Sequence, residues 1–284
     1  TYEIIASAGS KSVKLKVEVR DPDARKYRAL VIAGFSNPKG SGYLPFIINN
    51  IDGMQDALRN GSAGAVQYGN PKVVRNLRDK TQLKNEIRNA FKDADSNDVS
   101  VLYLGTHGYT AGYVRTQYGA VIRFSEILEC LKSVKGDVVV FMASCHSGYL
   151  RNYAKSVLGS ARLRRINIFC STGVATSSPY VAYKDYPTLS YDHFTKALTQ
   201  ALGFDMITNT TVAMAADGAG GGVADNQVTL GELDAYIRTQ VPKSVEASKK
   251  NHEAGYLRNG HALAPYTWVS SPGLVIASRA EEGE

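Results

Sequence analysis

The chain has 284 residues, 44% of them hydrophobic and 21% charged, so it is long enough for one large α/β domain or two small ones. No stretch reaches the ~18 uninterrupted apolar residues of a membrane-spanning helix, and we expect no membrane span. The net charge is +7, but the basic residues are scattered and form only small clusters such as Arg162 to Arg165. We interpret this pattern first as solvated surface and second as a loop that a protease could cleave. A nucleic-acid site is a distant third interpretation. We therefore expect no nucleic-acid partner.

The N-terminal segment 11–22 alternates apolar and charged residues with period two, which predicts a strand with one solvated face. Asp21 and Pro22 end this pattern. We interpret residues 1–27 as an N-terminal extension or the end of a preceding β domain. Residues 28–284 then form the main domain.

Strands and helices alternate along the main domain. Short apolar runs typical of strands that are buried on both faces occupy residues 28–34, 65–69, 98–105, 137–145, 166–172 and 272–278. Helical spacing of apolar residues marks residues 45–60, 81–94, 125–134, 190–203 and 229–241. Ser125 is a plausible N-cap, and Thr229 with Glu232 forms a capping box. The alternation predicts an α/β fold, with a mostly parallel central sheet of about six strands and helices on both faces.

The three cysteines argue against two kinds of site. An odd number of cysteines without a C-x-x-C pair favours neither a disulfide framework nor structural zinc. Cys130 lies in a predicted helix and Cys170 ends an apolar run, so both are expected to be small core residues. Cys145 differs, because in "ASCHSG" it follows a predicted buried strand and turn residues surround it.

Two predicted strands end in residues capable of nucleophilic chemistry. "LYLGTHG" places His107 at the end of one strand, and "VVFMASCHSG" places Cys145 at the end of the next. Functional groups in open α/β sheets collect at the carboxyl ends of the strands, where a thiol and an imidazole would face one crevice. In nucleophilic catalysis of this kind the thiolate is the attacking species. The nearby imidazole either removes the proton of the thiol or protonates the leaving amine. Backbone N–H groups of Gly108 and Cys145 could bind an oxyanion. A lone cysteine or histidine is usually structural, so the pattern leaves both interpretations open.

The motifs "YLGTHG" and "FMASCHSG" resemble the His-Gly and Cys motifs of the caspase-like cysteine peptidases. These include caspases, metacaspases, legumain, gingipain and clostripain, and "SCHSG" is especially similar to metacaspases. The resemblance covers roughly residues 28 to 280, including "NNIDGMQDAL", "SYDHFTKALTQALG" and "NQVTLGELDAYI". It implies a caspase-like three-layer sandwich and a peptidase domain over residues 28–284.

The resemblance also implies a function and roles for particular residues. The chain would be a cysteine endopeptidase, a thiol protease that cleaves a protein or peptide substrate through a thioester. Cys145 would be the nucleophile, His107 the general acid and base, and the backbone N–H groups of Gly108 and Cys145 the oxyanion hole. No cofactor would carry out the chemistry. We expect a bacterial protein located outside the cell or on its surface, with a cytoplasmic location as the alternative.

The sequence departs from those relatives at the position that would determine substrate preference. Metacaspases and clostripain typically have an aspartate two residues before the cysteine, where this chain has Ala143. A basic substrate side chain would lose its ion-pair partner there, so we do not expect strict Arg/Lys specificity. Recognition of aspartate would need convergent arginines, for which Arg115 and Arg123 are candidates. We expect the substrate pocket to include the residues Ala143, Ser144, Ser171, Thr172, Tyr180 and Tyr183. The alternative for the tyrosines is ordinary loop packing.

A calcium site is possible by the same resemblance but is poorly supported by the residues. A twelve-residue calcium loop ending at Glu232 would begin at Gly221 and have Val223 third, and neither supplies a ligand. The capping box accounts for Thr229 and Glu232. His146, which follows the nucleophile, is not expected to be catalytic, and surface or structural roles are expected for the histidines His193, His252 and His261. No zinc-ligand spacing connects them.

Two other classes of function remain alternatives. The chain could be a caspase-like binding or scaffold module that no longer catalyses a reaction. It could also be a cysteine hydrolase or acyltransferase acting on a non-protein acyl group, although no G-x-S/C-x-G turn of the α/β-hydrolases is present.

Overall fold

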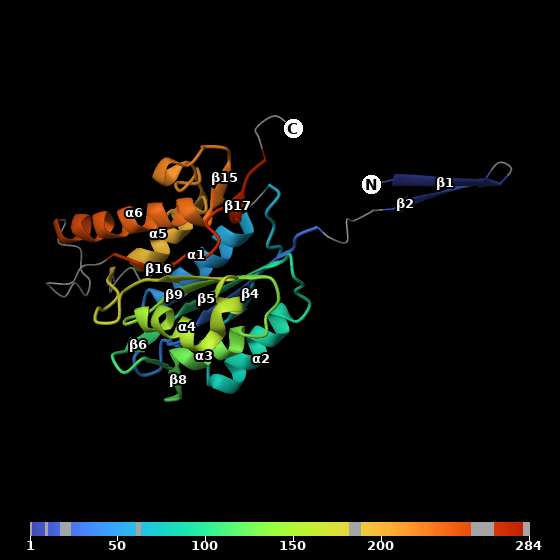
Figure 1. The fold of residues 1–284 in the computed structure, drawn as a ribbon. Helices are drawn as coiled ribbons and strands as arrows, with labels where there is room; N and C mark the ends of the chain where they lie inside the picture. The colour runs from blue at the N-terminus through green and yellow to red at the C-terminus, as the bar shows by residue number, and fades with distance from the viewer. Residues whose placement is uncertain are drawn as a thin grey trace.

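A computed structural model describes residues 2–8, 11–17, 24–60, 64–181, 189–250 and 264–280. At the N-terminus, β1 (Tyr2–Ala8) and β2 (Lys11–Val17) pair antiparallel in a two-stranded sheet of their own. The strand expected within residues 11–22 is therefore present as β2. The hairpin shares no pairing with the central sheet, and in Figure 1 it lies apart from the body of the molecule.

A six-stranded sheet forms the centre of the main domain, with strand order β16-β10-β9-β5-β3-β4. All neighbouring strands pair in parallel except β16, which runs antiparallel to β10. The sheet is therefore mixed and mostly parallel, which confirms the predicted α/β class. The strands span Tyr27–Ala33 (β3), Lys72–Val74 (β4), Val99–Gly105 (β5), Asp137–Ala143 (β9), Ile166–Cys170 (β10) and Tyr266–Trp268 (β16).

Among the described residues, helices cover both faces of this sheet (Figure 1). The first face carries α1 (Ile47–Asn60), α5 (His193–Ala201) and α6 (Leu230–Lys250). The other face carries α2 (Lys80–Phe91), α3 (Phe124–Leu131) and α4 (Gly148–Leu163). Along β5, Val101 and Tyr103 belong to the first core cluster, whereas Leu102 and Leu104 belong to the second. The strands read as continuous apolar runs because both of their faces are buried.

One strand prediction was wrong, and one predicted strand lies outside the central sheet. Residues 65–69 are not a strand, and the strand that follows α1 is β4, three residues further on. Val66 and Tyr68 are buried, but Val66 N–H donates to Ser278 Oγ and Tyr68 Oη donates to Ile276 O. The predicted strand at 272–278 exists as β17 (Val275–Ser278), but it pairs with β15 (Gln227–Thr229) outside the central sheet.

The predicted helix ends differ from the observed ones by a few residues. Asp79 and Asp192 accept backbone N–H groups as the N-caps of α2 and α5, so Ser190 does not begin a helix. The N-cap of α3 is Arg123, and Ser125 lies inside that helix. The capping box is confirmed, because Thr229 N–H donates to Glu232 Oε2 (2.8 Å) and Glu232 N–H donates to Thr229 Oγ1 (3.3 Å).

Short elements join the strands of the sheet to the helices. A three-stranded antiparallel sheet after β5 contains β6 (His107–Tyr109), β7 (Tyr113–Arg115) and β8 (Val121–Arg123). Between β10 and α5, β11 (Tyr180–Val181) pairs with β12 (Tyr191–Asp192). The remaining elements are β13 (Phe204–Asp205), β14 (Thr210–Thr211) and a 3-10 turn (Ala219–Gly221). No helix in the described ranges has the length and apolar character that crossing a bilayer requires.

A buried carboxylate holds the start of β5 against β3. Asp98 is inaccessible to solvent, and its carboxylate accepts from Lys26 N–H (2.8 Å), Arg28 Nη1 (2.5 Å) and Asp95 N–H (3.1 Å). Burial acts to raise the pKa of Asp98, but these hydrogen bonds and the Arg28 charge outweigh it, so the pKa lies below its ordinary value. The ionised carboxylate is therefore part of the folded structure.

Replacing Asp98 with alanine should lower the free energy of unfolding by about 2–4 kcal/mol, because Arg28 and two backbone N–H groups lose their acceptor. Because the folded-state pKa is depressed, the contribution is present at neutral pH and disappears as the pH falls below about 4. Urea denaturation at pH 7 and at pH 3 measures both effects. Exposed Asp93 provides the control, and an equal loss in Asp93→Ala would contradict the prediction.

Candidate active site

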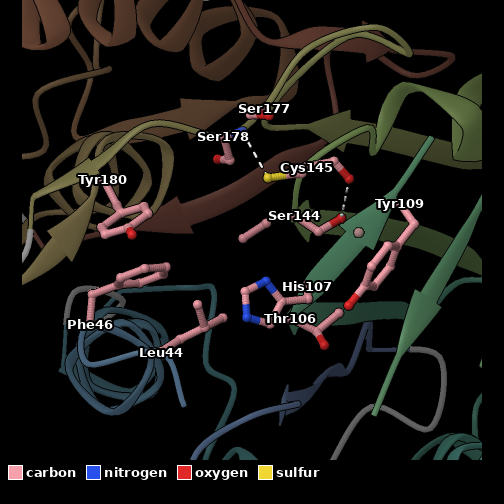
Figure 2. A pocket seen from close by; sticks show the side chains of 12 residues that line it. Leu44, Phe46, Thr106, His107, Tyr109, Ser144, Cys145, Ser177, Ser178 and Tyr180 are labelled. Carbon is pink, nitrogen blue, oxygen red and sulfur yellow. Dashed lines mark hydrogen bonds between the residues drawn. The ribbon is translucent and has the colours of Figure 1, made fainter. Parts of the chain in front are cut away.

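His107 and Cys145 follow two neighbouring parallel strands. Gly105 at the end of β5 pairs with Ala143 at the end of β9, so the segments that follow the two strands leave the sheet at the same edge. The two side chains line one cleft with a volume of about 640 Å³. Figure 2 shows the His107 ring and the Cys145 sulfur on opposite walls, both directed into this cleft. The structure therefore brings together the two residues that the sequence singles out.

The turn that carries Cys145 is attached to the loop after β10. Ser178 N–H donates to Cys145 Sγ at 3.3 Å (Figure 2). His146 adopts a positive φ of 56°, its N–H donates to Thr176 O (2.9 Å), and its Nδ1 donates to Val174 O (2.9 Å). His146 thus fixes the loop beside Cys145, while its ring is held by the Val174 carbonyl. Helix α4 starts three residues after the cysteine, at Gly148.

Ser171 and Thr172 lie beneath this turn. Each is only 1% exposed, and neither is among the residues that line the cleft. Ser171 Oγ donates to Ser144 O (3.0 Å) and accepts from Ser144 N–H (3.2 Å), while Thr172 N–H donates to Ser147 Oγ (3.1 Å). The structure therefore places them in a buried network that supports the turn of Cys145, and not in the wall where a substrate pocket was expected.

A single orientation of the His107 ring is favoured by its surroundings. Its Nε2 lies 3.0 Å from Gly42 O, and because a carbonyl only accepts, Nε2 carries the proton and Nδ1 is left as an acceptor. Phe35 packs against the ring edge to face, with centroids 4.5 Å apart. Burial lowers the pKa of His107 below its ordinary value, although the hydrogen bond to Gly42 acts in the opposite direction. At neutral pH the ring is therefore an uncharged proton acceptor.

Gly108 allows the two turns to touch. A Cβ atom at this position would lie 1.8 Å from Cys145 O, a distance that no side chain tolerates. The Cys145 carbonyl also accepts from Ser144 Oγ at 3.2 Å. The backbones of the two residues expected to form the oxyanion hole are thus adjacent at the cleft.

The two ends of the cleft differ. Leu44, Phe46 and Tyr180 gather at one end, and Tyr109 stands at the other, with His107 and Cys145 between them (Figure 2). Of the predicted pocket residues, Ala143, Ser144 and Tyr180 line the cleft, and Tyr183 lies outside the described residues. Among the described lining residues none is Asp, Glu, Lys or Arg.

Several lining residues were missed by the sequence analysis. Leu44 and Phe46 come from the loop after β3, which is the other neighbour of β5 in the sheet, so strand order would have pointed to this loop. The other residues missed are Thr106, Tyr109, Ser177 and Ser178. The candidate arginines Arg115 and Arg123 are not lining residues, and the Arg115 guanidinium lies 5.6 Å from the centroid of the Tyr109 ring.

The loop considered for calcium uses its carboxylates internally. Asp217 accepts from Asp225 N–H and Asn226 N–H, both at 3.0 Å. Glu232 accepts from Gly218 N–H (3.0 Å) in addition to the capping box. No group of three or more His, Cys, Asp and Glu side chains arranged to hold a metal occurs in the part of the chain that the structure describes.

The remaining histidines lie away from the cleft or outside the described residues. His193 is fully buried, and its Nδ1 lies 2.8 Å from Ser244 Oγ. Burial lowers the pKa of His193 to about 4, in keeping with the structural role expected. His252 and His261 lie within residues 251–263, outside the described part.

Replacing Phe35 with alanine should raise the pKa of His107 toward its ordinary value of 6.5, because water would reach a ring that is now desolvated. NMR titration of the imidazole signals, with His107→Gln to assign the resonance, measures the shift. Phe35→Leu keeps most of the apolar bulk and should move the pKa less. An unchanged or lower pKa in Phe35→Ala would show that burial by Phe35 is not the cause.

A comparison with protein-family models finds no match for this chain, and no curated protein is significantly similar to it in sequence. The case for a function therefore rests on the residues of the cleft and on their geometry.

Proposed function

We propose that the protein is a cysteine endopeptidase in which Cys145 is the nucleophile and His107 the general acid and base. The observation that carries this proposal is that Cys145 and His107 follow two neighbouring parallel strands, and that the thiol and the imidazole face each other across one cleft. A nucleophile and a base on such rigid elements are positioned by the sheet itself. The central sheet with helices on both faces also supports our proposal that the fold is caspase-like.

Hydrolysis would begin with transfer of the thiol proton to Nδ1 of His107, the nitrogen that the Gly42 hydrogen bond leaves as an acceptor. Cys145 Sγ then attacks the carbonyl carbon of the scissile bond. The Ser178 N–H group, 3.3 Å from the sulfur, helps to stabilise its negative charge until the S–C bond forms.

The carbonyl oxygen becomes an oxyanion, and the backbone N–H groups of Gly108 and Cys145 stabilise it. As the C–N bond breaks, the imidazolium of His107 donates its proton to the leaving amine, and a thioester remains on Cys145. Water then loses a proton to His107 Nδ1 and attacks the thioester carbon. The acid product leaves, and the sulfur recovers its proton, so the sequence needs no cofactor.

The Gly42 carbonyl has a defined part in this scheme. It fixes the tautomer of His107, and its acceptor oxygen stabilises the imidazolium that forms after the first proton transfer. Gly42 has φ of 73°, and a Cβ at this position would lie 2.9 Å from the Phe35 ring. Glycine is therefore required for the loop to present this carbonyl to the ring.

A peptide that carries a thiol-reactive group should label the wild-type protein and fail to label Cys145→Ala, because the attacking sulfur is missing. Hydrolysis of a denatured protein substrate should fall by at least about 10³-fold in Cys145→Ala and in His107→Ala. Mass spectrometry locates the label, and gel densitometry measures the hydrolysis.

Cys130→Ala is the matched control, since Cys130 is partly exposed but lies on α3, away from the cleft. It should be labelled and active like the wild type. Hydrolysis that survives in Cys145→Ala would refute the proposed nucleophile. A wild-type protein that binds peptides without cleaving them would instead support a binding module.

A further inference from the structure

We propose that the end of the cleft formed by Leu44, Phe46 and Tyr180, here called the aromatic end, is a neutral pocket that selects a large apolar or aromatic side chain. The side chain would belong to the residue whose carbonyl Cys145 attacks. This inference rests on the proposed peptidase function and specifies its substrate class.

The aromatic end is a continuous apolar wall. Phe46 and Tyr180 pack with ring centroids 4.5 Å apart and planes tilted by 33°. Leu44 and Phe46 are less than 9% exposed and belong to the core cluster on the α1 face, against which Tyr180 also packs. Since these side chains are anchored in the core, they present a fixed surface to a ligand. Such apolar and aromatic walls are typical of pockets that bind apolar groups.

Two further contacts hold this wall in place. Leu44 N–H donates to Phe35 O at 3.2 Å, which fixes the loop after β3. On the other side, Tyr180 pairs with Asp192 in the β11–β12 ladder. The wall therefore does not depend on the substrate to form.

The carboxylate of Asp192, the residue that pairs with Tyr180, is not available to a basic substrate. Asp192 is only 2% exposed, and its carboxylate accepts from Thr195 N–H (2.8 Å), from Thr195 Oγ1 (2.6 Å) and from Asn50 Nδ2. Burial raises the pKa of Asp192 to about 6, against the effect of these hydrogen bonds. A Lys or Arg side chain entering the aromatic end would lose hydration without gaining a counter-ion from the described lining residues.

The aromatic end lies beside the reacting sulfur. Ser178, whose N–H contacts Sγ, is two residues before Tyr180 in the chain, and both line the cleft. Tyr109 stands on the far side of His107 and Cys145 (Figure 2). A peptide that crosses the cleft therefore places one side chain at each end. We assign the aromatic end to the acyl side because its wall continues directly into the loop that holds the nucleophile.

Fluorogenic peptides with a constant aminocoumarin leaving group test this assignment, because only residues on the acyl side vary. Phe, Tyr, Leu or Met before the coumarin should give kcat/KM values roughly 100-fold above those for Arg, Lys or Asp. Each rate is corrected for that of Cys145→Ala. A profile led by a charged residue would overturn the inference while leaving the peptidase function intact.

Two variants make the assignment specific. Ala143→Asp adds a carboxylate to the lining of the cleft and should raise the rate for Arg and Lys relative to Phe by roughly 10-fold or more, whereas Ala143→Asn, which is isosteric with Asp, should not. Phe46→Ala should reduce the rate for Phe more than that for Ala substrates. Circular dichroism verifies that each variant is folded. If Ala143→Asp does not fold, the result for Phe46→Ala alone tests the pocket assignment.

The outcomes separate the two proposals. Cys145-dependent hydrolysis that shows no preference among side chains refutes the pocket but not the peptidase function. A preference that Phe46→Ala leaves unchanged does the same. Absence of Cys145-dependent hydrolysis of every peptide and of a denatured protein, together with absence of labelling by the thiol-reactive peptide, refutes the peptidase function and with it this inference.

Discussion

The pairing of β5 with β9 is the constraint on which the rest of the site depends. The register of this pairing places Gly105 opposite Ala143, so the residues that follow the two strands lie together at one edge of the sheet. Helices on both faces bury these strands, and buried parallel strands cannot slip without exposing apolar side chains or losing backbone hydrogen bonds. The separation of thiol and imidazole is therefore fixed by the core, and loops only refine it.

The sequence predicts this framework well for a physical reason. Strands buried on both faces are continuous apolar runs, and the runs at 98–105 and 137–145 correspond closely to β5 and β9. The same rule fails where burial does not come from the sheet. Val66 and Tyr68 are buried and hydrogen-bond to β17 outside the central sheet, so their apolar run falsely predicted a strand. The edge strand β16 is short and half exposed at Trp268, so it has no such run.

The site shows a similar division. Cys145 and His107 could be recognised from the sequence because each lies in a short contiguous motif. Leu44 and Phe46 carry no motif, and they reach the cleft only because β3 neighbours β5 in space. Ser171 and Thr172 directly follow a strand that ends near Cys145, yet both are buried beneath the turn that carries this cysteine. Strand order places a loop near a site, but the packing of individual side chains decides which of them line the cleft.

One loop connects two properties that are often treated as separable. The segment from Phe35 to Phe46 supplies the ring that packs against His107, the Gly42 carbonyl that orients it, and two residues that line the cleft, Leu44 and Phe46. A rearrangement of this loop would change the basicity of the imidazole and the shape of the pocket together. In the proposed peptidase, substrate binding and turnover would therefore be linked through this loop, and an evolutionary change of substrate would also have to preserve the environment of the His107 ring.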